Sequence, residues 1–186
     1  MLRDSTDVQI SSVDLETLIV FISIRRILFP TDFSEPAKEA QKYAMALADR
    51  FGAELHLMHV VPEVAMPLPD STTAWTLPPA DLKLLVDAAE KQLLQELGPD
   101  WAEERRTVHT AVVGNAVEEI IRYAKEHEIG LIVIGTHGRT GLSHLLLGSV
   151  AEKLVRLATC PVLTVHPQGH QFLIDDTAGH PRCAPS

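Results

Sequence analysis

The sequence has few cysteines, few aromatic residues and no long hydrophobic run. Its two cysteines, Cys160 and Cys183, are too few for a disulfide framework and lack the spacing of a zinc site. This suits a reducing compartment, so we expect a cytoplasmic protein. Aromatic residues make up 5% of the chain and hydrophobic residues 46%, so the core of the fold is predicted to be aliphatic.

The N-terminal residues 1–24 do not match a targeting or membrane segment. A membrane helix needs about 20 apolar residues, and a secretory signal has a basic start before its apolar region. Residues 1–24 hold one basic residue, Arg3, among four acidic ones, and their apolar run covers only 18–22. We therefore predict a flexible extension and no contact with a membrane. An extra strand and a partner-binding arm are the alternatives.

Basic residues are outnumbered by acidic ones. Sixteen Lys and Arg residues stand against 25 Asp and Glu residues, which gives a formal net charge of −9. Such a surface repels nucleic-acid phosphates and anionic lipids unless the positive charges are locally concentrated. We therefore expect no nucleic-acid partner. The length of 186 residues allows one domain and some excess, because a domain commonly has about 100–150 residues.

Residues 25–166 alternate between buried-strand patterns and helical stripes. The patterns predict five strands and four helices, so we expect a doubly wound, five-stranded parallel sheet of the α/β class. Residues 61–79 contain five prolines and are predicted to form a long loop or lid without regular structure. Residues 167–186 show no period and are predicted to be a disordered tail. The predicted strands are 25–32, 54–61, 106–113, 131–134 and 161–166, and the predicted helices are 36–51, 80–97, 115–128 and 149–158. The first helix is predicted to stop at Gly52, the apolar face of the second to include Leu85, and the third to begin with Asn115 as its N-cap.

The segment after the fourth predicted strand has the composition of an anion-binding loop. In doubly wound sheets the ligand lies beyond the carboxyl ends of the strands, where the winding direction reverses. There the sequence places Gly135, Gly138 and Gly141, followed by Gly148 and Ser149 at a helix start. Glycines let backbone N–H groups approach a phosphate, and a helix N-terminus adds unpaired donors. The alternative is that these glycines only form a loop. The segment is neither a Walker A motif nor GxGxxG.

These motifs together resemble the universal stress protein family. The resemblance rests on RRILFPTDFSEPAKEA, on the spacing Gly135-x2-Gly138-x9-Gly148-Ser149 and on CPVLTV, and it covers residues 25–166. It implies a Rossmann-like domain with strand order 3-2-1-4-5 that binds ATP or AMP, with Mg²⁺ as a possible companion, and that acts in stress responses. In that order strands one and four are neighbours, so Asp32 and the glycine loop would face one crevice.

The resemblance also implies a set of nucleotide-binding residues. Pro30 and Asp32 match positions that border the adenosine, and Val60 matches the position whose backbone contacts adenine. Asp32 has an alternative role as a turn or capping residue. His56 and His59 lie on strand two, where one of them is expected to be a hydrogen-bonded, partly buried histidine, and neither is expected to be a ligand. The binding residues implied are Pro30, Asp32, Val60, Ile134, Gly135, Thr136, His137, Gly138, Arg139, Thr140, Gly141, Gly148, Ser149, Val150 and Ala151.

The function implied is that of an ATP-binding stress regulator acting as a homodimer through protein partners. The edge strand 161–166 has an apolar edge that must be covered, and family members pair it across a dimer. The alternatives are a slow ATPase and a nucleotide-free dimeric interaction module. The sequence contains no evident nucleophile–base pair, so we assign no catalytic residues, and it shows no metal site. His137 and His144 are better explained as solvent-exposed loop residues or as neighbours of a phosphate than as a general base.

Overall fold

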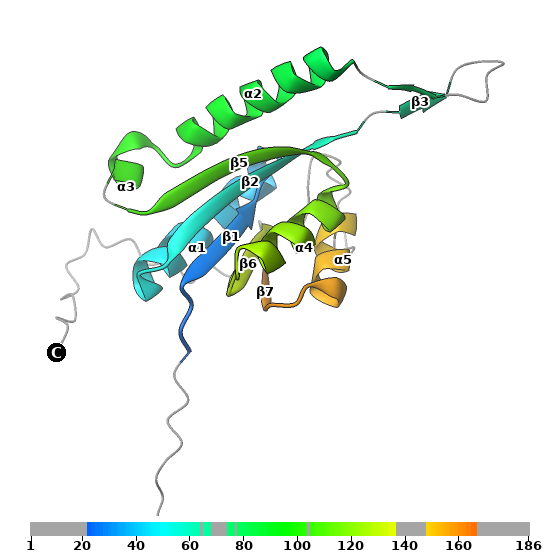
Figure 1. Ribbon diagram of the computed structural model, residues 1–186. Helices are drawn as coiled ribbons and strands as arrows, with labels where there is room; N and C mark the ends of the chain where they lie inside the picture. The colour runs from blue at the N-terminus through cyan, green and yellow to red at the C-terminus, as the bar shows by residue number, and fades with distance from the viewer. Residues whose placement is uncertain are drawn as a thin grey trace, which may run out of the picture.

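The main sheet has the predicted architecture. The computed structural model describes residues 22–63, 65–67, 74–76, 78–103, 105–136 and 148–166, and Figure 1 shows its elements. All neighbouring strands of the main sheet pair in parallel, in the order β5-β2-β1-β6-β7. Counted along this sheet the order is 3-2-1-4-5, so the doubly wound α/β fold is confirmed. The strands are β1 (Arg26–Pro30), β2 (Glu54–Pro62), β5 (Thr107–Gly114), β6 (Leu131–Gly135) and β7 (Val162–Val165).

Helices cover both faces of this sheet. On one face lie α1 (Glu35–Phe51) and α2 (Pro79–Glu96), and on the other lie α4 (Ala116–Glu126) and α5 (Ser149–Leu157) (Figure 1). Side chains of a strand point alternately to the two faces. In β1, Ile27 and Phe29 therefore join the core beneath α1 and α2, whereas Leu28 joins the core beneath α4 and α5. The carboxyl ends of the strands are left open between these layers.

The ends of two helices follow from local sequence. Helix α1 begins after Ser34, whose side chain accepts a hydrogen bond from the backbone of Ala37, and it ends at Gly52, which has a φ of 60°. A left-handed residue after the last turn favours glycine. Helix α4 begins after Asn115, whose side chain accepts from the backbone N–H of Val117 at 3.0 Å. The predicted stop at Gly52 and the predicted cap at Asn115 are confirmed.

The proline-rich segment 61–79 differs from its prediction. It contains the antiparallel pair β3 (Ala65–Pro67) and β4 (Ala74–Thr76), so the expectation of a segment without regular structure was wrong. Prolines are tolerated at the margins of strands, and Pro67 is the last residue of β3. The short helix α3 (Pro99–Glu103) was also not predicted. In α2, Leu85 was assigned to the buried stripe but is 45% exposed.

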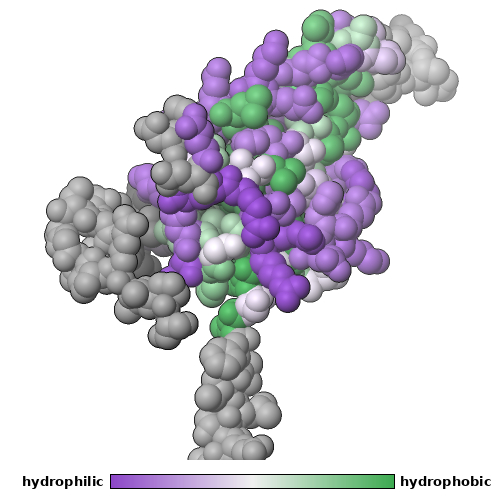
Figure 2. Space-filling model, turned by 60° about the vertical axis from the view of Figure 1, so that its left-hand side comes forward, coloured by the Kyte–Doolittle hydropathy of each residue, from purple (hydrophilic) through white to green (hydrophobic). Residues whose placement is uncertain are grey.

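The predicted extension and tail fall largely outside these elements. Residues 1–21 and 167–186 lie outside the described residues, so the domain boundaries at 25 and 166 and the flexibility of both ends stay predictions. On the face drawn in Figure 2, hydrophilic residues dominate and hydrophobic residues form separate patches. No helix in the described segments is long and apolar enough to cross a membrane.

Candidate functional site

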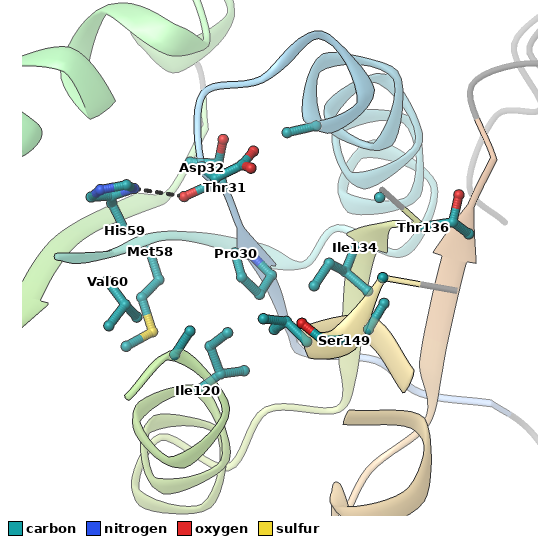
Figure 3. A pocket seen from close by; sticks show the side chains of 16 residues that line it. Pro30, Thr31, Asp32, Met58, His59, Val60, Ile120, Ile134, Thr136 and Ser149 are labelled. Carbon is teal, nitrogen blue, oxygen red and sulfur yellow. Dashed lines mark hydrogen bonds between the residues drawn. The ribbon is translucent and has the colours of Figure 1, made fainter. Parts of the chain in front are cut away.

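A cavity of about 240 Å³ opens at the carboxyl ends of the central strands. Its walls come from the ends of β1, β2 and β6 and from the first turns of α1, α4 and α5. In Figure 3, Met58 and Val60 lie on one side of the cavity, and Ile134, Thr136 and Ser149 lie on the other. The lining residues are Pro30, Thr31, Asp32, Ala37, Met58, His59, Val60, Ala116, Ile120, Ile134, Gly135, Thr136, Gly148, Ser149, Val150 and Ala151.

The structure brings most of the predicted site residues together around this cavity. Asp32 and the start of the glycine loop face one crevice, as predicted. The predicted residues His137, Gly138, Arg139, Thr140 and Gly141 lie outside the described residues. The predicted residues that line the cavity are Pro30, Asp32, Val60, Ile134, Gly135, Thr136, Gly148, Ser149, Val150 and Ala151.

Several lining residues were missed by the sequence analysis. Thr31 and His59 stand next to predicted residues in the sequence, and Met58 comes one residue before His59 in β2. Their positions at the ends of neighbouring parallel strands were the signal that could have found them. The other missed residues are helical and belong to apolar stripes that indicate packing and not a site. They are Ala37 in α1 and Ala116 and Ile120 in α4.

Asp32 stabilises the turn that leads from β1 into α1. Its Oδ1 accepts hydrogen bonds from the backbone N–H of Ser34 at 3.1 Å and from the Ser34 hydroxyl at 2.5 Å. Ser34 in turn caps α1. The alternative role of a turn aspartate is thus observed, and the same side chain also lines the cavity. The two roles are compatible because a carboxylate has two oxygen atoms.

The two ends of the glycine loop are tied together at the base of the cavity. The backbone N–H of Gly148 donates to the Thr136 carbonyl at 2.6 Å, and the N–H of Thr136 donates to the Val165 carbonyl at 2.9 Å. The N–H of Gly148 is therefore already used, which corrects the expectation that it is an unpaired donor. Helix α5 begins at Ser149 without a side-chain cap, and its first intrahelical bond runs from the Glu152 N–H to the Gly148 carbonyl.

The start of α5 is the part of the cavity best suited to an anion. The N–H groups of the residues before Glu152 have no carbonyl partner within the helix, and the N-terminal end of the helix dipole is positive. These N–H groups belong to Ser149, Val150 and Ala151, which all line the cavity. Among the described lining residues Asp32 is the only carboxylate, and none is Lys or Arg. Among the described lining residues, the donors available to an anion here are therefore backbone N–H groups and the hydroxyls of Ser149 and Thr136.

The opposite end of the cavity is apolar. Met58 is fully buried and Ile120 is 2% exposed, and both pack in the core beneath α4, with Val60 against them. Apolar walls of this kind fit a ring system better than a charged group. Across the described residues there is no cluster of three or more His, Cys, Asp or Glu side chains that could hold a metal ion.

Comparisons with known proteins agree with this architecture. Residues 23–166 match the model of the Universal stress protein family. Universal stress protein MJ0531 of Methanocaldococcus jannaschii is 37% identical over 145 residues, which cover 76% of this chain and 81% of that protein.

Two solved structures share the fold. The universal stress protein UspA from Lactobacillus plantarum aligns with a TM-score of 0.64 and 27% identity, over 78% of this chain and 99% of its own. A universal stress protein in complex with cAMP aligns with a TM-score of 0.56 and 21% identity, over 79% of this chain and 100% of its own. From the sequence match and the fold together, the chain belongs to the universal stress protein family.

Proposed function

We propose that the cavity binds an adenine nucleotide, ATP or AMP, and that the protein is a nucleotide-binding stress regulator that acts through protein partners. The observation that supports this most directly is that the two ends of the cavity differ in polarity. One end is apolar and the other has backbone N–H groups at the start of a helix. A nucleotide shows the same difference, with an apolar base at one end and phosphate at the other. The solved relative with cAMP supports the fold only, because its identity is 21%.

The base would lie between the ends of β1 and β2. Met58, Val60 and Ile120 supply apolar contacts there, and Pro30 lines the cavity at the end of β1. The backbone of Val60 is the predicted contact for adenine. The Asp32 carboxylate lines the same region and would accept a hydrogen bond from a nucleoside hydroxyl or amino group.

The phosphates would lie at the start of α5. Backbone N–H groups of Ser149, Val150 and Ala151 and the hydroxyls of Ser149 and Thr136 would donate to phosphate oxygens. The predicted Arg139 would add a charge-assisted contact. If Mg²⁺ accompanies the nucleotide, its main ligands would be phosphate oxygens and water, since Mg²⁺ in such sites keeps several waters.

The test is a nucleotide analysis followed by titration. Mass spectrometry of the purified protein would identify bound nucleotide, and calorimetry with ATP and Mg²⁺ would measure its affinity. Asp32→Asn keeps an oxygen for the Ser34 turn but removes the charge, so we expect the affinity to fall about tenfold or more. Asp81→Ala, an exposed acidic residue in the first turn of α2, is the matched control and should bind as the unaltered protein does.

The outcomes separate the candidate functions. Absence of ATP and AMP binding in the unaltered protein would refute the nucleotide proposal and favour a nucleotide-free interaction module. An Asp32→Asn variant with undiminished affinity would show that the base and ribose lie elsewhere. Turnover above about 1 s⁻¹, the lower end of ordinary enzyme rates, would favour an ATPase.

The partner that the sheet itself favours is a second copy of the chain. Strand β7 pairs with β6 on one side and is the last strand in the order of the main sheet. Its Leu163 is 36% exposed, and Val155 and Leu157 in the neighbouring helix α5 are 52% and 59% exposed. An apolar edge strand has unpaired N–H and C=O groups that can pair with a strand of another chain. The proposed homodimer therefore forms through the 161–166 edge.

A further inference from the structure

The turn after β1 has a backbone conformation that needs support. Phe33 has a φ of 62°, in the left-handed region that is unfavourable for residues with a side chain. The Thr31 hydroxyl accepts a hydrogen bond from the backbone N–H of Phe33 at 3.0 Å, and Asp32 binds Ser34 as described above. Such conformations persist where surrounding contacts fix them, and they concentrate at ligand sites. The turn is thus built to hold Asp32 in one place.

His59 connects this turn to the neighbouring strand. Its Nδ1 lies 2.8 Å from the Thr31 carbonyl oxygen, as the dashed line in Figure 3 shows. Because a carbonyl oxygen can only accept, Nδ1 must hold the proton. The imidazole also stacks on the ring of Phe33, with 4.5 Å between the ring centroids. His59 is also buried. Its ring is therefore held by a hydrogen bond at Nδ1, by the stacked Phe33 ring on one face and by the surrounding protein.

The hydrogen bond extends the pairing of β1 and β2 beyond the end of β1. The regular register ends at Pro30 opposite Met58, and the N–H of Thr31 donates to the Met58 carbonyl at 2.9 Å. The bond from His59 to the Thr31 carbonyl adds a second connection one residue further on. Both residues that follow in sequence, Asp32 and Val60, line the cavity. Without this bond, the Thr31 carbonyl would lose its partner and the spacing between Asp32 and Val60 could relax.

We propose that His59 is a positioning residue that fixes Asp32 relative to Val60 and so sets the nucleoside end of the site. This inference rests on the proposed adenine-nucleotide function. It assigns His59 no proton transfer and no contact with phosphate. The residue acts through the Thr31 carbonyl, and its effect is confined to the base and ribose.

Two substitutions separate the hydrogen bond from the stacked ring. In His59→Asn the amide Nδ2 stands where Nδ1 stood, so the bond to Thr31 is kept while the stack on Phe33 is lost. In His59→Phe the stack is kept and the bond is lost. Calorimetry with ATP and with adenosine should show His59→Asn close to the unaltered protein and His59→Phe about tenfold weaker, because a buried carbonyl is left unpaired. The loss of affinity should be equal for ATP and adenosine, because both contain the base and ribose on which His59 acts and only ATP contains phosphate.

His56→Phe is the matched control because it makes the same change in the same strand on the opposite face. His56 bonds to Tyr123 and does not line the cavity, so His56→Phe should bind both ligands as the unaltered protein does. Thermal unfolding must show that each variant is folded at the titration temperature. If His59→Phe does not fold, ¹⁵N spectra of the unaltered protein still test the inference, because they report whether Nδ1 or Nε2 of His59 holds the proton.

Four results would overturn the inference while leaving the nucleotide proposal intact. Three of them are equal affinities of His59→Phe and the unaltered protein, equal losses in His59→Asn and His59→Phe, and a proton on Nε2 alone. The fourth is a loss for ATP without a loss for adenosine, because the effect would then lie at the phosphate end. If the unaltered protein binds neither ligand, the nucleotide proposal fails and the inference fails with it.

Discussion

Acidification should destabilise this fold through His56, which is 3% exposed between β2 and α4. Its Nε2 lies 3.2 Å from the Glu54 carboxylate, and its Nδ1 lies 2.9 Å from the Tyr123 hydroxyl. The carboxylate can only accept, so Nε2 donates and Nδ1 of the neutral ring accepts from the Tyr123 O–H. Burial lowers the pKa of His56 below 6.5, although Glu54 opposes the shift. The neighbouring residues His127 and Arg26 also lower this pKa.

The sign and the upper limit of the effect follow from proton linkage. Between the lowered folded pKa and the unfolded value of 6.5, the unfolded chain binds more protons than the folded one. Stability from this residue is therefore present above pH 6.5 and is lost as the pH falls through that value toward the folded pKa. If the folded ring stays neutral, going from about pH 7.5 to about pH 5.5 reduces the free energy of unfolding by at most about 1.4 kcal/mol.

Urea denaturation of the unaltered protein and of His56→Asn at both pH values would measure this effect. The asparagine Oδ1 can accept from Tyr123 but cannot titrate, so the variant should lose less stability on acidification. Burial also lowers the pKa of His109 and raises the pKa of Glu96, but both residues are present in the two proteins and cancel in the difference. Equal losses in the two proteins would refute the assignment, as would a larger loss in the variant.

Two further predictions test the turn and the sheet edge. Both Phe33→Gly and Phe33→Ala remove the ring, but only glycine avoids the cost of the left-handed conformation, about 1–2 kcal/mol, which is partly offset by the greater entropy of glycine in the unfolded chain. Urea denaturation should therefore give Phe33→Gly a free energy of unfolding about 1 kcal/mol higher than that of Phe33→Ala. Equal stabilities of the two variants would contradict a strained backbone at position 33. Leu163→Asp should convert a dimer to a monomer in light scattering, whereas Leu94→Asp, an exposed leucine of α2, should not. A monomeric unaltered protein would exclude the proposed interface.

The elements predicted best are those whose signals are local. Pro36 and Gly52 delimit α1, and the alanine stripe between them requires contact with the sheet. Asn115 marks the start of α4 in the same way. The strand order came from the family resemblance, and unbroken apolar strands separated by helices are compatible with few other arrangements. For these elements, sequence and tertiary structure favour the same conformation.

The elements missed are those in which local signals oppose the structure. Five prolines between residues 61 and 79 argue against strands, yet β3 and β4 have only three residues each, and Pro67 is the last residue of β3. Helix α3 has only five residues and is too short to show a periodic pattern. Leu85 was assigned to the buried stripe of α2 from its helical spacing alone, yet its side chain is 45% exposed.

The site shows a similar limit, because its glycines are visible in the sequence whereas its cross-strand contacts are not. The bond between His59 and Thr31 joins residues 28 apart, and its acceptor is a backbone carbonyl, which every residue has. No residue type at position 31 therefore marks the contact. It becomes predictable once the strand order places β1 beside β2 and the register sets Pro30 opposite Met58, because Thr31 then lies next to His59. The register of β1 against β2 is thus the information needed to identify His59 as a positioning residue.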